Sequence, residues 1–143
     1  MKSNARNLLN KHHLKYSKQR EILIDFLYEL DRPITIEECY DMLRSKGANM
    51  NLSTVYRIVD TFSQHGFLEK VYNSITNTTM IQIIKHHHHH YLICVSCHKM
   101  IPIDFCPIKE ALQYIEKDHH FKVTAHQLEI SGYCQECQIK ADR

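Results

Sequence analysis

Apolar residues recur along the chain with the spacing of one helix face. Four segments repeat the spacing i, i+3, i+4, i+7, and their members are Leu23, Phe26, Leu27 and Leu30; Ile36, Cys39, Tyr40 and Leu43; Val55, Ile58, Val59 and Phe62; and Ile108, Ala111, Leu112 and Ile115. Because an α-helix has 3.6 residues per turn, this spacing places the apolar side chains on one stripe that packs against a core. We therefore predict four amphipathic helices.

Residues near the expected helix ends support these assignments. Ser17 and Ser53 suit helix N-termini, because a hydroxyl oxygen accepts a hydrogen bond from an unpaired backbone N–H. Thr35 and Glu38 have the spacing of a capping box. The glycines and the proline expected at helix ends or first turns are Gly47, Gly66 and Pro107.

The helical spacing gives way after Gly66 to segments rich in β-branched and aromatic residues. Segments 67–72 and 79–84 flank a polar turn, which predicts a β-hairpin. Two more strands are expected at 90–95 and 99–104. A helix at 107–118 and a strand at 121–131 follow. This order predicts an α+β protein with a β-β-α-β second half.

Two small domains fit the length of 143 residues. We predict one domain over residues 1–84, which contains the hairpin and the first three helices, and a second domain over residues 85–143, which contains the cysteine pairs. Domains of this size bury a modest fraction of their surface, so a metal or a partner chain is expected to stabilise them.

The helix-turn-helix pattern comes from the predicted helices at 36–46 and 53–65. The exposed face of the second helix offers Thr54, Tyr56 and Arg57, with Ser53 at its start. Such groups contact phosphates and base edges in a major groove. An ordinary solvated helix face is the alternative interpretation.

The distribution of charged residues adds one candidate DNA-binding segment, at the N-terminal end of the sequence. The net charge is +2, but residues 1–20 contain six lysines and arginines, Lys15 and Arg20 among them, with no acidic residue. This basic segment is a second candidate contact with DNA, or a plain solvated face. No segment has the roughly 18 apolar residues that a membrane span needs, and we expect a cytoplasmic protein.

Six cysteines in a reducing compartment point to metal ligands or free thiols rather than disulfides. Cys94-x-x-Cys97 and Cys134-x-x-Cys137 are two knuckles separated by 36 residues. Together they predict a closed four-thiolate site for a structural zinc ion, with a redox dithiol as the alternative.

The two other cysteines are interpreted differently. Cys39 lies on an apolar helix stripe, so we predict that it is a core residue. Cys106 precedes Pro107, and we favour a core thiol over a metal ligand.

Five consecutive histidines, residues 86–90, stand just before the first cysteine knuckle. If this segment is a strand, His87 and His89 point to one side, and His86, His88 and His90 point to the other. Consecutive histidines can thus supply two metal sites. Neutral imidazole suits zinc, iron, nickel and copper. The acidic and imidazole groups that could complete these sites are Glu69, Asp104, Glu110, His119, His120 and His126.

These motifs together resemble the Fur family of metal-responsive repressors. The resemblance runs through nearly the whole chain, and its motifs are Leu14-Lys15-Tyr16-Ser17-Lys18-Gln19-Arg20, Ser53-Thr54-Val55-Tyr56-Arg57, the histidine-rich segment before Cys94-x-x-Cys97, and the segment from His126 to Cys134. The histidine run and Asp104-Phe105-Cys106-Pro107 are most similar to the zinc uptake regulators of the family, called Zur.

The resemblance implies that residues 1–84 form a winged helix-turn-helix DNA-binding domain and that residues 85–143 form a metal-binding dimerisation domain. It implies a homodimer that binds a palindromic operator in double-stranded DNA and represses zinc-uptake genes when zinc is plentiful. It implies a regulatory hinge site matched by Glu69, His87 and His89. It also implies a second site in the dimerisation domain, whose counterparts are His88, His90, Glu110 and His126.

The chain departs from the family pattern at several positions. Tyr91 stands where the family usually has a histidine, so His87 is assigned in its place. The cysteine that zinc regulators often place upstream is missing from segment 81–84. Iron and peroxide sensors often have a histidine at the position of Pro33 and an acid near Gln82. Neither is present, so we favour Zn²⁺ over Fe²⁺ or Mn²⁺ at the regulatory site.

The sequence thus predicts a metal-dependent transcriptional repressor that is not an enzyme. An iron-responsive or peroxide-responsive repressor is the alternative within the family. A metalloenzyme is disfavoured because no H-E-x-x-H pattern supplies a base beside an open metal site. A metal-storage module would have no use for the predicted DNA-binding face.

Overall fold

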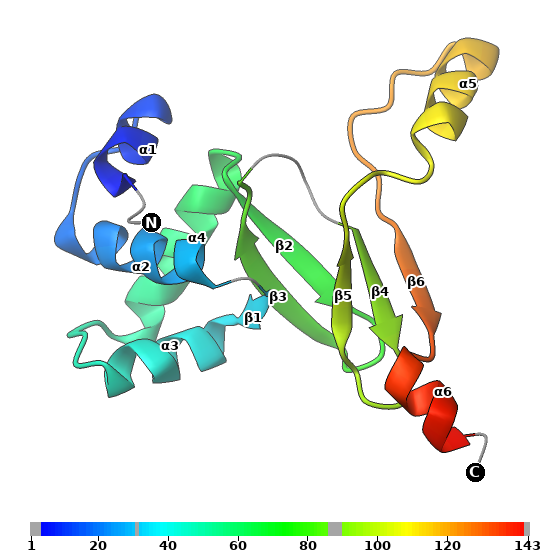
Figure 1. Cartoon of the computed structure of the whole chain (residues 1–143). Coiled ribbons are helices and arrows are strands. Elements are labelled where there is room, and N and C mark those ends of the chain that lie inside the picture. Colours follow the sequence, from blue (N-terminus) through cyan, green and yellow to red (C-terminus); the bar gives the residue numbers. More distant parts are fainter. Residues whose placement is uncertain (1–3, 31, 86–89, 142–143) are drawn as a thin grey trace. The chain divides into compact units, whose positions relative to one another are not determined.

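The computed structural model of the protein describes residues 4–30, 32–85 and 90–141. The chain divides into two compact units, residues 1–87 and 88–143, and Figure 1 labels their helices and strands. In the described residues, no helix is both long and apolar enough to pass through a membrane.

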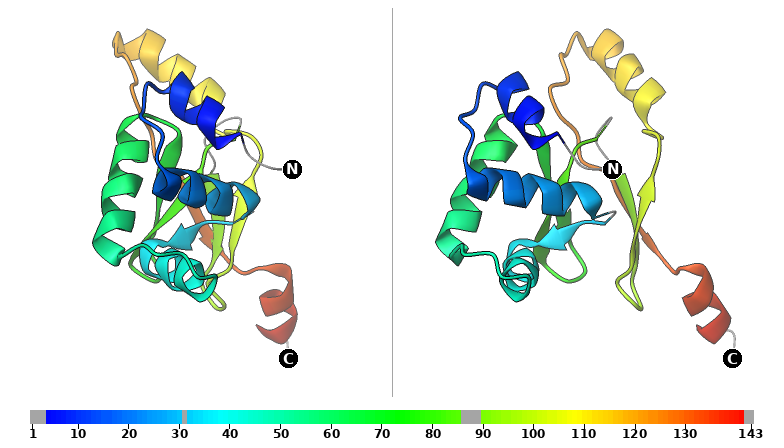
Figure 2. Two further views of the ribbon diagram at one scale, coloured as in Figure 1. Left: turned by 90° about the vertical axis from the view of Figure 1, so that its left-hand side faces the viewer. Right: turned by 60° about the vertical axis from the view of Figure 1, so that its left-hand side comes forward.

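The first unit packs helices against one small sheet. Its elements are α1 (Ala5–Lys11), α2 (Lys18–Glu29), β1 (Ile34–Thr35), α3 (Ile36–Ser45), α4 (Leu52–Gln64), β2 (Leu68–Asn73) and β3 (Thr78–Ile83). Helices α2, α3 and α4 lie on one side of the sheet (Figure 2). Their predicted apolar stripes are largely buried and form one core with the sheet, in which Leu23, Val55 and Phe62 have no exposed surface.

The sheet of the first unit has the strand order β1-β3-β2, and both pairings are antiparallel. The predicted hairpin is therefore present, with Leu68 opposite Ile83 at its open end. The buried side chain of Asn73 holds its turn, because Oδ1 accepts hydrogen bonds from the backbone N–H groups of Ile75 (3.0 Å) and Thr76 (3.2 Å).

Several predicted caps are confirmed, and one is wrong. Ser17 Oγ accepts from the Arg20 N–H at 3.1 Å, and Thr35 Oγ1 accepts from the Glu38 N–H at 3.1 Å. Gly47 and Gly66 have φ values of +85° and +82°, in the left-handed region that favours glycine. Ser53 does not cap α4: the cap is Asn51, whose Oδ1 accepts from the Thr54 N–H at 2.8 Å.

The second unit is built on a three-stranded sheet of order β5-β4-β6. Its elements are β4 (His90–Cys94), β5 (Met100–Ile103), α5 (Lys109–His119), β6 (Glu129–Gly132) and α6 (Gln135–Ala141). The central strand β4 is antiparallel to β5 and parallel to β6. The strand predicted at 121–131 is too long, because only its last residues pair with β4.

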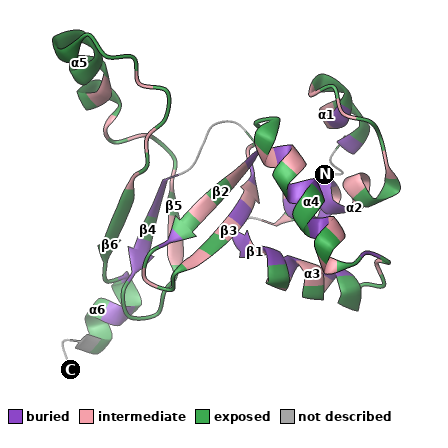
Figure 3. Cartoon of the chain, turned by 180° about the vertical axis from the view of Figure 1, so that it is seen from behind, coloured by how far each residue is buried: buried purple, intermediate pink, exposed green. Residues whose placement is uncertain are grey.

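Helix α5 exists close to its predicted limits, but its predicted buried stripe is not buried. None of its residues is buried, and Ile115 keeps 41% of its surface exposed. Figure 3 shows the helix covered mainly by exposed and half-buried residues. The apolar face of α5 is therefore left uncovered by this chain.

Candidate metal centres and nucleic-acid interface

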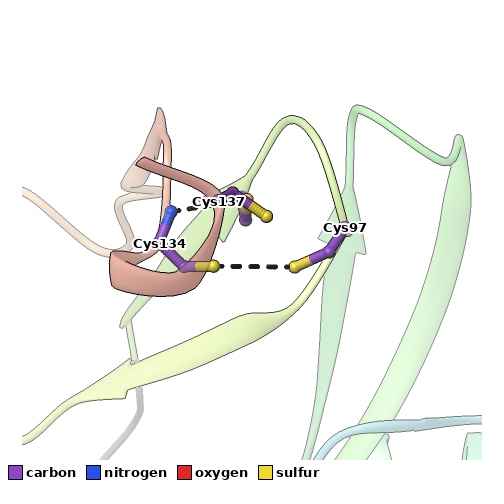
Figure 4. A group of neighbouring side chains, drawn as sticks. Cys97, Cys134 and Cys137 are labelled. Atoms are coloured by element: carbon purple, nitrogen blue, oxygen red, sulfur yellow. Dashed lines mark hydrogen bonds between the residues drawn. The ribbon is translucent and has the colours of Figure 1, made fainter. Parts of the chain in front are cut away.

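Four thiols meet where the second sheet ends. Cys94 ends β4, Cys97 lies in the following turn, and Cys134 and Cys137 stand at the start of α6. Their Sγ atoms all lie within 4.8 Å of one another. In Figure 4, the Cys97 side chain points from its turn towards Cys134, which immediately precedes α6.

The spacing of these thiols fits a zinc ion. With Zn–S bonds near 2.3 Å, the sulfur atoms of a tetrahedral site are separated by about 3.8 Å. The Sγ atoms of Cys97 and Cys134 lie 3.8 Å apart. All six cysteines are free thiols, so no disulfide competes for these sulfur atoms.

Hydrogen bonds from backbone N–H groups favour the thiolate form of Cys94, which is the form that binds a metal. The Cys134 N–H donates to Cys94 Sγ at 3.4 Å, and this bond, together with one from the Cys97 backbone, lowers the pKa of Cys94 to about 6. A hydrogen bond with Ser96 lowers the pKa of Cys137, but the bond with Cys134 and burial outweigh it and raise the value to about 11. Cys94 is thus a thiolate at neutral pH, whereas Cys137 has to lose a proton when a metal binds.

A second cluster joins three segments of the second unit. The Nε2 atoms of His90 and His126 lie 3.0 Å apart, and Cys106 Sγ lies 3.4 Å from His126 Nε2. Within the described residues, this trio and the four cysteines are the groups of three or more His, Cys, Asp or Glu side chains close enough to share a metal ion.

The trio overlaps only in part with the predicted second site. His90 and His126 are brought together, and His88 lies outside the described residues. Glu110 is an exposed residue in the first turn of α5 and is not in the cluster. Cys106 is in the cluster instead, and its side chain is half-buried. Cys39, by contrast, is fully buried in the first unit, and burial raises the pKa of its thiol to about 12.

The predicted hinge site is only partly described. Glu69 is half-buried in β2, opposite Gln82 of β3. His87 and His89 lie outside the described residues.

The predicted DNA-binding residues of the first unit are held by local contacts. On α4, Arg57 Nη2 donates to Thr54 Oγ1 at 3.2 Å, and Ser53 Oγ donates to the capping Asn51 at 2.9 Å. Near α2, Arg20 Nη1 donates to the Lys15 carbonyl at 2.7 Å.

Tyr56 links the two helices of the helix-turn-helix. Its hydroxyl donates to the Glu37 carboxylate of α3, which lowers the pKa of Glu37 and raises that of Tyr56. Asp60 on the same helix pairs with Lys70 of β2 at 2.9 Å and so ties the hairpin to α4.

Sequence reasoning missed two of these participants, Asn51 and Glu37, and it favoured a core thiol over a metal ligand for Cys106. Asn51 carried a usable signal, because Asn is among the best helix caps. The partners of Glu37 and Cys106 lie 19 and 20 residues away, so no short motif marks them.

Comparison with known proteins gives consistent relatives. The sequence profile of the ferric uptake regulator family, FUR, matches residues 11–131. The ferric uptake regulation protein of Campylobacter upsaliensis is 30% identical over 94% of this chain and 87% of its own. The zinc uptake regulation protein of Mycobacterium tuberculosis is 28% identical over 87% of this chain and 95% of its own.

A solved structure agrees with these relatives. The structure of the Helicobacter pylori ferric uptake regulator Fur, described as having three functional metal-binding sites, matches with a TM-score of 0.75 and 29% identity. The match covers 93% of this chain and 88% of that chain.

Proposed function

Since this chain belongs to the ferric uptake regulator family of metal-responsive transcription regulators, we propose that it is a zinc-responsive repressor that controls zinc-uptake genes. As a regulator of transcription rather than an enzyme, it acts on DNA in the cytoplasm. The four-cysteine cluster is the observation that carries zinc binding, because its geometry fits a closed zinc site.

The four cysteines serve structure rather than sensing. A closed site leaves no coordination position open, and its ligands come from both ends of the second unit. Zinc there clamps β4 to α6, so that metal binding adds directly to folding free energy.

Sensing belongs to the histidine-rich sites. We assign Glu69, His87 and His89 to the hinge site, and His88, His90 and His126 to the second site, where the family resemblance assigns the carboxylate role to Glu110. A cation that binds the DNA-competent arrangement more tightly than other arrangements shifts the population towards it.

DNA binding is assigned to α4 and the segment before α2. The exposed face of α4 presents Tyr56 and Arg57, and both are tethered so that little side-chain freedom remains to be lost on binding. The working form is a homodimer on a palindromic operator, since the uncovered apolar face of α5 needs a partner.

Iron is the rival cation, because several relatives are ferric uptake regulation proteins. The test measures binding to a DNA fragment, selected from random sequence with both metals present, by fluorescence anisotropy. Protein holding only its structural zinc is titrated with buffered Zn²⁺ or, without oxygen, with Fe²⁺. We expect Zn²⁺ to activate binding at lower free concentration. Activation by Fe²⁺ alone contradicts the zinc proposal, and binding that needs no added metal contradicts sensing.

A further inference from the structure

The trio of His90, Cys106 and His126 comes from three separate parts of the second unit. His90 begins the central strand β4, Cys106 lies before α5, and His126 lies in the irregular segment before β6. Their ligand atoms lie within 4.8 Å of one another although 16 to 36 residues separate the positions. Folding has therefore brought two imidazoles and a thiol to one point.

Two neighbours of His126 approach the same ring nitrogen. His126 Nε2 faces both His90 Nε2, at 3.0 Å, and Cys106 Sγ, at 3.4 Å. A neutral ring nitrogen carries either one proton or one lone pair, so it can bond well to only one neighbour. His90 is only 4% exposed, so this end of the trio is shielded from water.

The same distances suit a shared cation. In a tetrahedral site with bonds near 2.05 Å to nitrogen and 2.3 Å to sulfur, neighbouring nitrogens are about 3.3 Å apart. The corresponding nitrogen–sulfur separation is about 3.6 Å. The observed 3.0 and 3.4 Å are short of these values by about 0.2 to 0.3 Å, so small side-chain movements suffice.

We propose that His90, Cys106 and His126 bind a thiophilic divalent cation such as Zn²⁺ or Co²⁺, with the Cys106 thiolate in the role assigned above to the Glu110 carboxylate. One thiolate beside two imidazoles selects borderline-soft cations and disfavours Mn²⁺, which prefers oxygen ligands. Three protein ligands leave the fourth tetrahedral position for water or another side chain. The inference deepens the proposed metal response and rests on it for its regulatory meaning.

Cobalt(II) tests this ligand set, because thiolate ligation gives a charge-transfer absorption that carboxylate ligation lacks. The full-length protein, with zinc retained in its four-cysteine site, is titrated with Co²⁺ while its zinc content is measured. We expect one of the added Co²⁺ ions to give the thiolate band, in addition to any Co²⁺ bound at the proposed hinge site. Cys106→Ser should abolish the band and weaken binding at least about tenfold. The matched variant Glu110→Gln should keep both, and an unchanged zinc content shows that each variant is folded.

A thiolate band that persists in Cys106→Ser, or binding lost in Glu110→Gln, overturns the proposal. So does a wild-type protein that takes up no second cation. His126→Ala gives a further check, since it should weaken Co²⁺ binding without touching the thiol. The DNA-binding test is separate: failure of metal-activated DNA binding with the cobalt band intact defeats the repressor function and leaves this site standing.

Discussion

The sulfur atom of Cys94 accepts hydrogen bonds from backbone N–H groups of the protein. The backbone N–H of Cys134 lies 3.4 Å from its sulfur, and α6 follows at once along the chain. A charged sulfur is thus stabilised by the segment that also supplies two other ligands. Replacing the sulfur of Cys94 would therefore remove both a candidate zinc ligand and a hydrogen bond from the backbone of Cys134.

Cys94→Ser should remove one zinc ion per chain and unfold the second unit. The serine hydroxyl is a poor zinc ligand. The second unit is small and has little apolar core, so its folded state depends on zinc bound by the four thiols. Zinc content by elemental analysis and a thermal melt measure both effects. Cys39→Ala is the matched control, because it removes a thiol from the other unit and should leave zinc content unchanged.

Zinc retention should depend on pH in a defined direction. The pKa of Cys94 is lowered from 9.0 to about 6, so the thiolate predominates at pH 7 and takes up a proton as the pH falls through 6. Bound zinc competes with that proton, so zinc release should increase as the pH falls. A chromogenic chelator should therefore report retained zinc at pH 7.5 and progressive loss under acid conditions. Zinc loss that begins above pH 7 contradicts this expectation.

Asn51 and Ser53 offer a direct comparison at the start of α4. Asn51→Ala removes the cap and should destabilise the protein by about 1 kcal/mol, or about 4–8 °C for a unit of this size. Ser53→Ala removes only a hydroxyl that donates to Asn51 and should cost less than about 0.5 kcal/mol. Thermal melts of the two variants give the measurement, and equal losses contradict the assignment of the cap.

At the scale of elements, α4 has two faces with separate tasks. Val55, Val59 and Phe62 are fully buried in the core, and the opposite face presents Tyr56 and Arg57. Contacts to α3 and β2 hold the helix at both sides, through Glu37 and Lys70. The exposed face is therefore presented on a rigid support.

Arg57→Ala should weaken DNA binding and lower its salt dependence. If the guanidinium contacts a phosphate, its loss reduces the slope of log affinity against log salt by about 1. Anisotropy titrations at several salt concentrations measure the slope. Lys117→Ala, on the exposed surface of α5, is the charge-matched control and should leave the slope unchanged.

The elements that the sequence predicted well are those whose pattern is local. Helices α2, α3 and α4 and the hairpin follow from side-chain spacing and polar turns. Helix α1 was missed, because its seven residues were treated as a basic segment although Ala5 and Leu9 are buried. The two residues of β1 are paired only through β3, and no local pattern marks so short a strand.

Candidate sites were likewise predictable where a local motif marks them and not where the fold brings distant residues together. The four cysteines were found because each knuckle is a local motif. Cys106 was interpreted as a core thiol, since its neighbours His90 and His126 reach it only through the pairing of β4, β5 and β6. Glu110 was suggested by family resemblance, and sequence alone could not show that it lies outside the cluster.

At the scale of the whole molecule, the apolar face of α5 predicts self-association. Ile115→Glu places a charge on the uncovered stripe, and a buried unpaired charge is strongly disfavoured. We expect the dimer to dissociate at micromolar concentration, as measured by analytical ultracentrifugation. Gln113→Glu adds the same charge to an exposed polar position of α5 and should leave the dimer intact.

The parallel pairing of β4 with β6 has a consequence for how the protein is made. The central strand of the second sheet pairs in parallel with residues 129–132, and the zinc cluster takes its last two thiols from Cys134 and Cys137. During synthesis the first unit can fold while the ribosome is still translating the second. The zinc clamp cannot close until Cys134 and Cys137 have been synthesised. In a zinc-starved cell, newly made chains would therefore carry a folded first unit joined to an unclamped second one, exposed to proteases until metal arrives.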